Sequence, residues 1–265
     1  MKIAGYQMQS MTGDVEANLD KIAKAAARAA EEGARLLITP ELAINGYGAA
    51  EALVETAVSA QSPTMARLSE MAARTGLTIV AGFAESDGDV IYNSAVLTDG
   101  SGEFAVYRKS HLYGPYERRW FSVEEPRAIL ADVDGMRVGM LICYDVEFPE
   151  NVRRLAKAGA DLVVVPTALP IGWSGSFIAE HMIRVRAFEN QVFVAYINHC
   201  GADRNFAYAG RSRIAAPDGS LLAEAPADDE ALFFAEIVAS AFDQSRAENT
   251  YLRDLRELLP ARDPQ

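Results

Sequence analysis

Three reactive side chains each follow a predicted strand. Glu41 comes directly after an apolar segment that ends at Pro40, Lys109 follows the second arm of a predicted hairpin, and Cys143 follows an apolar run. Polar groups beyond the C-terminal ends of strands gather at one edge of an α/β sheet, so we expect the three to converge. A carboxylate, an amine and a thiol can act as general base, charge stabiliser and nucleophile. Together they indicate covalent catalysis through a thiol.

Each of these residues taken alone has an ordinary structural explanation. A free cysteine at a strand end is usually a small buried apolar group, and loop Glu and Lys side chains are usually exposed and unpaired. The chemical interpretation therefore depends on the three together. A different thiol hydrolase would use one of the three histidines, His111, His181 or His199, as the base.

The elements that position these residues alternate between strand and helix, which is typical of the α/β class. An apolar strand is predicted at Ile3–Gln7, and an Ala-rich helix follows at Val15–Glu31. After the strand Leu36–Thr39, a second helix begins at Pro63 and is ended by Gly76, and a further strand follows that glycine.

The two halves of the chain repeat this order. Gly33–Pro40 is similar to Gly159–Pro166, with the same spacing from glycine to proline, and a helix at Ala179–Asn190 followed by a strand at Val192–Ile197 matches the second helix and its strand. Asp-Gly-Ser turns at Asp99 and Asp218 each predict a hairpin. Each half is therefore predicted to run β-α-β-α-β-β-β.

Two such halves can pack sheet on sheet with their helices outside. We therefore predict an α/β fold, a four-layer α-β-β-α sandwich with two pseudo-equivalent halves, against the alternative of two unrelated α/β units. Residues 1–265 are predicted to form a single domain with a C-terminal helical tail from about residue 241. One side of this tail is apolar and could cover the core or a partner subunit: Tyr251, Leu252, Leu255, Leu258 and Leu259.

Composition excludes several classes of protein. Half of the 265 residues are apolar and 23% are charged, which excludes a disordered chain, a collagen-like repeat and a small disulfide scaffold. The net charge of −12, without a basic segment, makes nucleic acid and anionic membranes poor partners. No secretory signal, membrane span or Gly-rich phosphate loop is predicted, and two cysteines form no disulfide framework. A cytoplasmic location is expected.

The segments around the three reactive residues resemble those of the nitrilase or carbon-nitrogen hydrolase superfamily. They are T-P-E-L at Thr39–Leu42, Y-R-K-S-H-L at Tyr107–Leu112, L-I-C-Y-D-V-E-F-P-E at Leu141–Glu150 and R-V-R-A-F-E-N at Arg184–Asn190. The resemblance covers nearly the whole chain. It is greatest to the amidase branch, represented by bacterial aliphatic amidases, because nitrilases usually carry Trp-Glu after the cysteine where this chain has Tyr144 and Asp145.

This resemblance implies the same sandwich and a catalytic set of Glu41, Lys109 and Cys143, without a metal or an organic cofactor. It also implies a homodimer or higher homo-oligomer and an oxyanion held by Lys109 and the backbone N–H of Tyr144. The family places a second glutamate before a Pro-Gly pair. Glu117 has the matching spacing, but the Pro-Gly is absent and Glu124 is the alternative.

The implied reaction is hydrolysis of a small linear carboxamide to a carboxylic acid and ammonia through a cysteine thioester. Either Glu41 takes the proton of Cys143, or the charge of Lys109 lowers the pKa of the thiol. Two alternatives remain within the superfamily, an N-carbamoyl amine hydrolase and a nitrilase. An inactive binding protein on the same fold is the third.

Substrate choice must come from loops after the strands. The candidates are the segment 168–176 with Trp173, Phe177 beyond it, Tyr116 and Asn198. Trp173 is equally explained by packing. Carbamoyl amino-acid hydrolases of the superfamily tend to place an arginine near the cysteine, where this chain has Glu147. This favours neutral amides or amides bearing an amine, the latter if Glu147 points inward.

Overall fold

The computed structural model describes residues 1–256 and contains two six-stranded sheets. In spatial order, the first sheet consists of β12 (Ala231–Glu236), β1 (Lys2–Gln7), β2 (Leu36–Ile38), β3 (Thr78–Asp87), β4 (Val90–Thr98) and β5 (Ala105–Arg108). The second consists of β11 (Leu221–Glu224), β10 (Arg213–Ala215), β9 (Phe193–Asn198), β8 (Leu162–Thr167), β7 (Met136–Met140) and β6 (Leu130–Val133).

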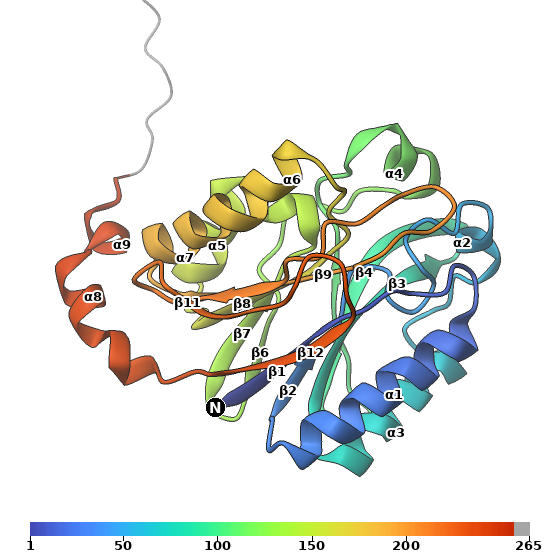
Figure 1. Cartoon of the computed structure of the whole chain (residues 1–265), viewed down its shortest axis with the longest axis horizontal. Coiled ribbons are helices and arrows are strands. Elements are labelled where there is room, and N and C mark those ends of the chain that lie inside the picture. The colour runs from blue at the N-terminus through green and yellow to red at the C-terminus, as the bar shows by residue number, and fades with distance from the viewer. Residues whose placement is uncertain (257–265) are drawn as a thin grey trace, which may run out of the picture.

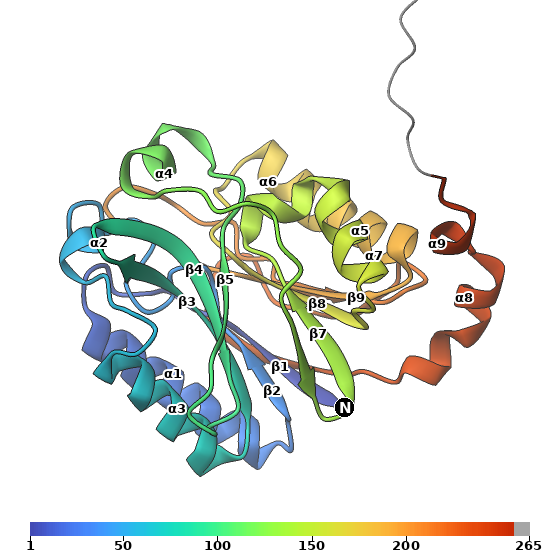
Figure 2. The same ribbon diagram turned by 180° about the vertical axis from the view of Figure 1, so that it is seen from behind.

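Helices cover the outer faces of both sheets (Figures 1 and 2). The first half contains α1 (Val15–Glu31), α2 (Ala52–Glu55), α3 (Pro63–Thr75) and α4 (Gly114–Trp120). The second half contains the 3₁₀-helix η1 (Cys143–Glu147), α5 (Pro149–Lys157), α6 (Trp173–Phe177), the π-helix η2 (Ile178–Met182), α7 (Ile183–Asn190), the 3₁₀-helix η3 (Ala239–Phe242), α8 (Asp243–Glu248) and α9 (Tyr251–Asp254). Helices α1 and α3 lie on the first sheet, and α5 and α7 lie on the second. The predicted four-layer sandwich is confirmed.

The long helices begin and end at the residues that the sequence indicated. The Asp14 carboxylate accepts a hydrogen bond from the N–H of Ala17 at the start of α1. Ser62 and Pro63 begin α3 in the same way, and Gly76 ends it in the left-handed conformation that glycine adopts without strain. These caps fix where each helix returns the chain to its sheet.

The two sheets have the same topology. In the first, β1, β2 and β3 are parallel, and β4 and β5 follow as antiparallel strands. In the second, β7, β8 and β9 are parallel, and β10 and β11 follow as antiparallel strands. The two predicted hairpins are therefore β4–β5 and β10–β11.

The sixth strand of each sheet comes from a different place in the chain. In the second sheet, β6 directly precedes β7 in the chain and pairs with it antiparallel. In the first sheet, the equivalent place beside β1 is taken by β12, with Lys2 opposite Glu236 and Gln7 opposite Ala231. The second sheet is thus built from consecutive strands, whereas the first joins both ends of the described chain.

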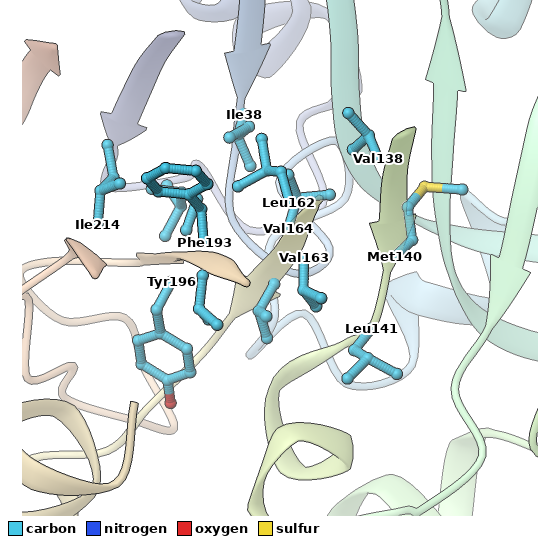
Figure 3. Packing of buried hydrophobic residues seen from close by; sticks show 14 of the residues in the cluster. Ile38, Val138, Met140, Leu141, Leu162, Val163, Val164, Phe193, Tyr196 and Ile214 are labelled. Carbon is cyan, nitrogen blue, oxygen red and sulfur yellow. The ribbon is translucent and has the colours of Figure 1, made fainter. Parts of the chain in front are cut away.

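The core lies between the sheets. Along β2, Leu36 and Ile38 face the second sheet, while Leu37 faces the layer of α1 and α3, as the two-residue period of a strand requires. Ile38 belongs to the same buried cluster as Leu162 and Val164 of β8 (Figure 3). With both faces of each parallel strand covered, these strands are apolar throughout.

The tail packs beside α7. Phe242 lies against Phe193, with ring centroids 5.3 Å apart, and Tyr251 lies against Phe188 at 5.7 Å. Leu258 and Leu259, part of the apolar face expected in the tail, lie outside the described residues. Within residues 1–256, no helix is both long and apolar enough to span a lipid bilayer.

Candidate active site

Lys109 connects two carboxylates in the interior of the molecule. Its Nζ lies 2.6 Å from Glu41 Oε1 and 2.7 Å from Glu117 Oε1, and all three side chains are buried. Lys109 is the first residue after β5, Glu41 follows β2, and Glu117 lies in α4. An ammonium group has three N–H donors, so one donor is not used by these two ion pairs.

Glu117, and not Glu124, is the glutamate that the structure brings to Lys109. The Tyr47 hydroxyl donates to Glu117 Oε1 at 2.8 Å, and the N–H of Tyr113 donates to Glu117 Oε2, also at 2.8 Å. Glu124 instead lies 3.5 Å from the guanidinium of Arg108. The two donors on Glu117 fix the carboxylate that in turn holds the lysine.

Glu41 has one oxygen occupied and one free. Oε1 accepts hydrogen bonds from Lys109 and from Nδ2 of Asn93, the latter at 2.7 Å, whereas within the described residues Oε2 has no partner. Burial raises the pKa of Glu41 to about 7, against the opposing charge of Lys109 and with a further increase from Glu117. A carboxyl group with this pKa is suited to proton transfer near neutral pH.

The turn that carries Glu41 rests on both sheets. It passes so close to β3 that a Cβ atom on Gly82 would collide with the backbone nitrogen of Leu42 and lie 2.6 Å from the carbonyl oxygen of Pro40. His199, which follows β9, lies with Nε2 2.6 Å from the carbonyl oxygen of Glu41. Burial lowers the pKa of His199 to about 4, so the ring is neutral and has one N–H, and the contact to Glu41 is shorter than the 3.2 Å from Nδ1 to the carbonyl oxygen of Met8.

Cys143 begins η1 with a positive φ of 43°, a conformation that few side-chain-bearing residues adopt. Burial raises the pKa of its thiol well above the usual value, Glu41 adds to this, and Lys109 opposes it. The thiol is therefore protonated at neutral pH. Of the two routes to a thiolate, this favours proton transfer to Glu41 over a lowered thiol pKa.

Asp145 joins the turn after Cys143 to the turn after Lys109. Its Oδ1 accepts hydrogen bonds from the Ser110 hydroxyl at 2.8 Å and from the N–H of His111 at 2.9 Å. Its Oδ2 accepts from the Tyr107 hydroxyl at 2.9 Å. Because Asp145 is fully buried, these bonds hold the nucleophile turn and the lysine turn in one fixed relation.

A cavity of about 270 Å³ opens beside the thiol. This is just below the ~300–1,000 Å³ typical of small-molecule sites. Its lining includes five residues of the predicted segment 168–176, and it consists of Tyr47, Tyr113, Cys143, Tyr144, Glu147, Ala168, Leu169, Pro170, Ser174, Gly175 and Ile178. The site therefore suits a small substrate.

A model of the carbon-nitrogen hydrolase family matches residues 2–247. The chain belongs to this family. It is 42% identical over 97% of its length to a protein called hydrolase in pqqF 5′ region from Pseudomonas protegens, 89% of which is covered. It is 34% identical over 98% of its length to an (R)-stereoselective amidase from Pseudomonas sp., 93% of which is covered.

A solved structure extends this comparison to the fold of the hydrolase. An amidase from Nesterenkonia AN1, of the nitrilase superfamily, superposes with a TM-score of 0.86 and 35% identity over 97% of this chain and 94% of that one. In another structure, a variant of that amidase carries the acetamide moiety of fluoroacetamide covalently attached at its active-site cysteine. The expected superfamily, amidase branch and sandwich are confirmed.

The predicted binding residues of this carbon-nitrogen hydrolase divide into two groups. Tyr144 and Glu147 line the cavity. Tyr116 does not; its ring packs on Tyr47 at 5.6 Å, and it lines a separate surface pocket. Trp173 is 79% exposed. Asn198 is buried and accepts a hydrogen bond from the N–H of Leu169 at 2.7 Å, so it supports the cavity wall from behind.

The histidines of the hydrolase have other partners than the thiol. His111 lies 2.9 Å from Asp145 and stacks on Phe148, with ring centroids 4.0 Å apart. His199 supports the backbone of Glu41, and His181 lies in η2 against Phe177. This arrangement favours Glu41 over a histidine as the base.

The sequence analysis did not predict three residues of the site. Asn93 could have been suspected, because it is a polar residue in the apolar strand β4. Tyr47 lies in an irregular loop without a motif. Tyr113 contributes its backbone N–H to Glu117, and a backbone contact leaves no signal in residue type.

Proposed function

We propose that this carbon-nitrogen hydrolase is an amidase, which converts a small linear carboxamide into a carboxylic acid and ammonia through a thioester on Cys143. The observation that carries the proposal is the pairing of Lys109 with Glu41 and Glu117 behind a small cavity that Cys143 lines. The similarity to two amidases, one of them modified at its active-site cysteine, supports it.

In the first half of the reaction, the free Oε2 of Glu41 accepts the proton of the thiol, and the sulfur of Cys143 attacks the carbonyl carbon. The negative charge that develops on the oxygen is stabilised by the third N–H of Lys109 and by the backbone N–H of Tyr144. This N–H lies in the first turn of η1, where backbone donors have no partner within the helix. Loss of one such donor typically slows a reaction about 10²- to 10³-fold.

The tetrahedral intermediate collapses when protonated Glu41 gives its proton to the nitrogen, the C–N bond breaks and ammonia leaves. The acyl group remains on Cys143 as a thioester. A water molecule then loses a proton to Glu41 and attacks the thioester, and the thiol leaves with that proton. The balance is one amide and one water for one carboxylic acid and one ammonia.

Glu117 acts through Lys109. It shares the ammonium with Glu41 and is itself fixed by Tyr47 and Tyr113, so the position of the ammonium group is fixed. Such placement matters because a displacement of about 1 Å can cost ~10²-fold in rate. Glu117 is therefore a positioning residue in the proposed mechanism.

Three further expectations accompany this function as proposals. A cytoplasmic location is supported by the two free thiols, Cys143 and Cys200. The acidic net charge argues against nucleic acid as a partner. A homodimer or higher homo-oligomer is supported by exposed apolar side chains beside the cavity, Ile171, Trp173 and Phe177, and light scattering would measure the mass of the assembly.

The function is tested by ammonia release from propionamide, a long-chain amino amide, a carbamoyl amine, a dicarboxylic acid monoamide and a nitrile. We expect the native protein to hydrolyse amides and Cys143→Ala to release no ammonia, while Cys200→Ala, which removes the other free thiol, stays active. Circular dichroism would establish that all three proteins are folded. Equal release by the native protein and Cys143→Ala, or none from either, would leave a binding protein on the same fold.

A further inference from the structure

Tyr47 lines the cavity and also contacts the buried charges of the site. Its side chain is buried and borders the space beside Cys143. Its hydroxyl donates to Glu117 Oε1 at 2.8 Å, the same oxygen that receives Lys109 Nζ at 2.7 Å. Burial raises the pKa of this hydroxyl well above its usual value, and the charges of Glu117, Glu41 and Cys143 raise it further. The hydroxyl therefore keeps its proton and lies at the reacting end of the cavity.

The hydroxyl of Tyr47 has one proton, and Glu117 receives it. A phenol oxygen can accept a hydrogen bond as well as donate one. Within residues 1–256, the contact with Glu117 is the one hydrogen bond that this hydroxyl forms. What Tyr47 offers to a molecule in the cavity is therefore an acceptor and not a donor.

The ring of Tyr47 is fixed in place by its neighbours. Phe206 and Tyr208 lie edge-on to it, with ring centroids at 5.2 and 6.2 Å, and Tyr116 lies tilted at 5.6 Å. The Tyr116 hydroxyl donates to the carbonyl oxygen of Tyr47 at 2.9 Å and accepts from the N–H of Ala50 at the same distance. The acceptor oxygen is thus held in one position before a substrate binds.

A primary carboxamide matches the polarity of this end of the cavity. Its oxygen can accept two hydrogen bonds, and its NH₂ group can donate two. In the proposed mechanism the oxygen receives the third N–H of Lys109 and the N–H of Tyr144. Two acceptors remain for the nitrogen, the free Oε2 of Glu41 and the hydroxyl oxygen of Tyr47. Because the oxygen and the NH₂ group are nearly equal in size, polarity and not shape must orient the carboxamide.

We propose that Tyr47 binds the nitrogen of the carboxamide by accepting one of its two N–H groups, while Glu41 faces the other. This inference rests on the proposed amidase function, because it assumes that the carbonyl carbon lies at Cys143. The contact directs the amide oxygen toward Lys109 and keeps the nitrogen beside the carboxyl group that protonates it. An ester has no N–H and leaves the acceptor unpaired, so Tyr47 selects amides against esters of the same acid.

The test compares propionamide with methyl propionate, which give the same thioester on Cys143 and the same charge on the carbonyl oxygen. Propionate formation measures kcat/KM for both. Tyr47→Phe removes the hydroxyl and keeps the ring, and we expect it to lower the amide-to-ester ratio of kcat/KM by about 10- to 100-fold, because only the amide loses a hydrogen-bond partner. Tyr116→Phe is the matched control. It removes a hydroxyl from the neighbouring ring, which does not line the cavity, and should keep the native ratio.

Glu117→Gln separates a contact with the substrate from support of Lys109. If Tyr47 acted only through Glu117, then Tyr47→Phe would slow the amide and the ester by the same factor, as we expect for Glu117→Gln. Calorimetry with propionamide on Cys143→Ala, with and without Tyr47→Phe, measures binding without any proton transfer. We expect Tyr47→Phe to weaken this binding by about 10- to 100-fold and to leave the affinity for methyl propionate unchanged.

The outcomes separate the two proposals. Cys143-dependent amide hydrolysis would leave the amidase intact, but an unchanged amide-to-ester ratio in Tyr47→Phe, or unchanged propionamide binding, would overturn the role of Tyr47. If the native protein cleaves the amide and not the ester, the calorimetric comparison decides. Tyr47-dependent binding of propionamide without hydrolysis of any amide would refute the amidase and retain the carboxamide site. Neither hydrolysis nor binding would refute both.

Discussion

Burying a lysine between two carboxylates leaves the site with one excess negative charge and little water to solvate it. Lys109, Glu41 and Glu117 are all fully buried, and an arrangement of this kind gains stability only when each charge is paired and hydrogen-bonded. Glu117 meets that condition through two further donors, whereas one oxygen of Glu41 does not. The free oxygen leaves Glu41 able to accept a proton.

The pH dependence of hydrolysis follows from this asymmetry. The base form of Glu41 is required, and its pKa is raised to about 7, so kcat/KM for a neutral amide should fall about tenfold per pH unit below pH 7. The pKa of Lys109 is raised well above its usual value, so no decline is expected just above neutral pH. Initial rates of ammonia release, measured across the pH range, give this dependence of kcat/KM on pH. Glu147→Gln should keep the same acidic limb, and a limb centred near 4.5 would contradict the role of Glu41.

At the scale of single elements, the decisive contact is the turn after β2 lying directly on β3. Gly82 permits this contact because it has no Cβ, and its carbonyl oxygen accepts a hydrogen bond from Ile44 at 3.1 Å. A larger residue at position 82 would collide with backbone atoms of this turn, and backbone atoms cannot move aside as the end of a side chain can. The position of Glu41 thus depends on a glycine in a neighbouring strand.

Gly82→Ala should therefore impair catalysis more than stability. We expect a loss of at least ~10² in kcat/KM, because the turn is displaced, and a destabilisation of about 1–3 kcal/mol. Gly139→Ala in β7 is the control, since the atoms nearest to its new methyl are side-chain ends, those of Leu155 at 3.0 and 3.1 Å and that of Leu130 at 3.3 Å. Kinetics and thermal unfolding of both variants measure the difference. Equal kcat/KM for Gly82→Ala and Gly139→Ala would show that the turn tolerates the displacement.

The sequence predicted the elements better than their long-range contacts. The helix at Val15–Glu31, the hairpins and the strand ends that carry Glu41, Lys109 and Cys143 were available from local pattern, because caps, turns and apolar periodicity are local. Strand β6 and the place of β12 beside β1 were not, since strand pairing depends on residues far apart in the chain. The same reason hid Tyr47, which reaches the site from the loop after β2, and Asn93, which reaches it from β4.

For the whole molecule, we propose that the described chain is one domain with the tail packed on it. The first sheet needs both the first and the last strand of the described residues, and the sheets share one buried core, so neither half has a complete fold of its own. Urea unfolding should give coincident midpoints by far-ultraviolet circular dichroism and by the fluorescence of Trp120 in a Trp173→Phe variant, at one protein concentration. Two separated midpoints would indicate independently folding halves.

The pairing of β12 with β1 also has a consequence for biosynthesis. At about 5–20 residues per second, a ribosome adds residues 231–236 roughly 10–45 s after β1. Throughout that interval one edge of β1 has unpaired N–H and C=O groups, and such an edge can recruit strands from other chains. The nascent polypeptide must therefore be kept from aggregating until β12 has been synthesised, which makes it a natural client for chaperones that bind extended segments at the ribosome.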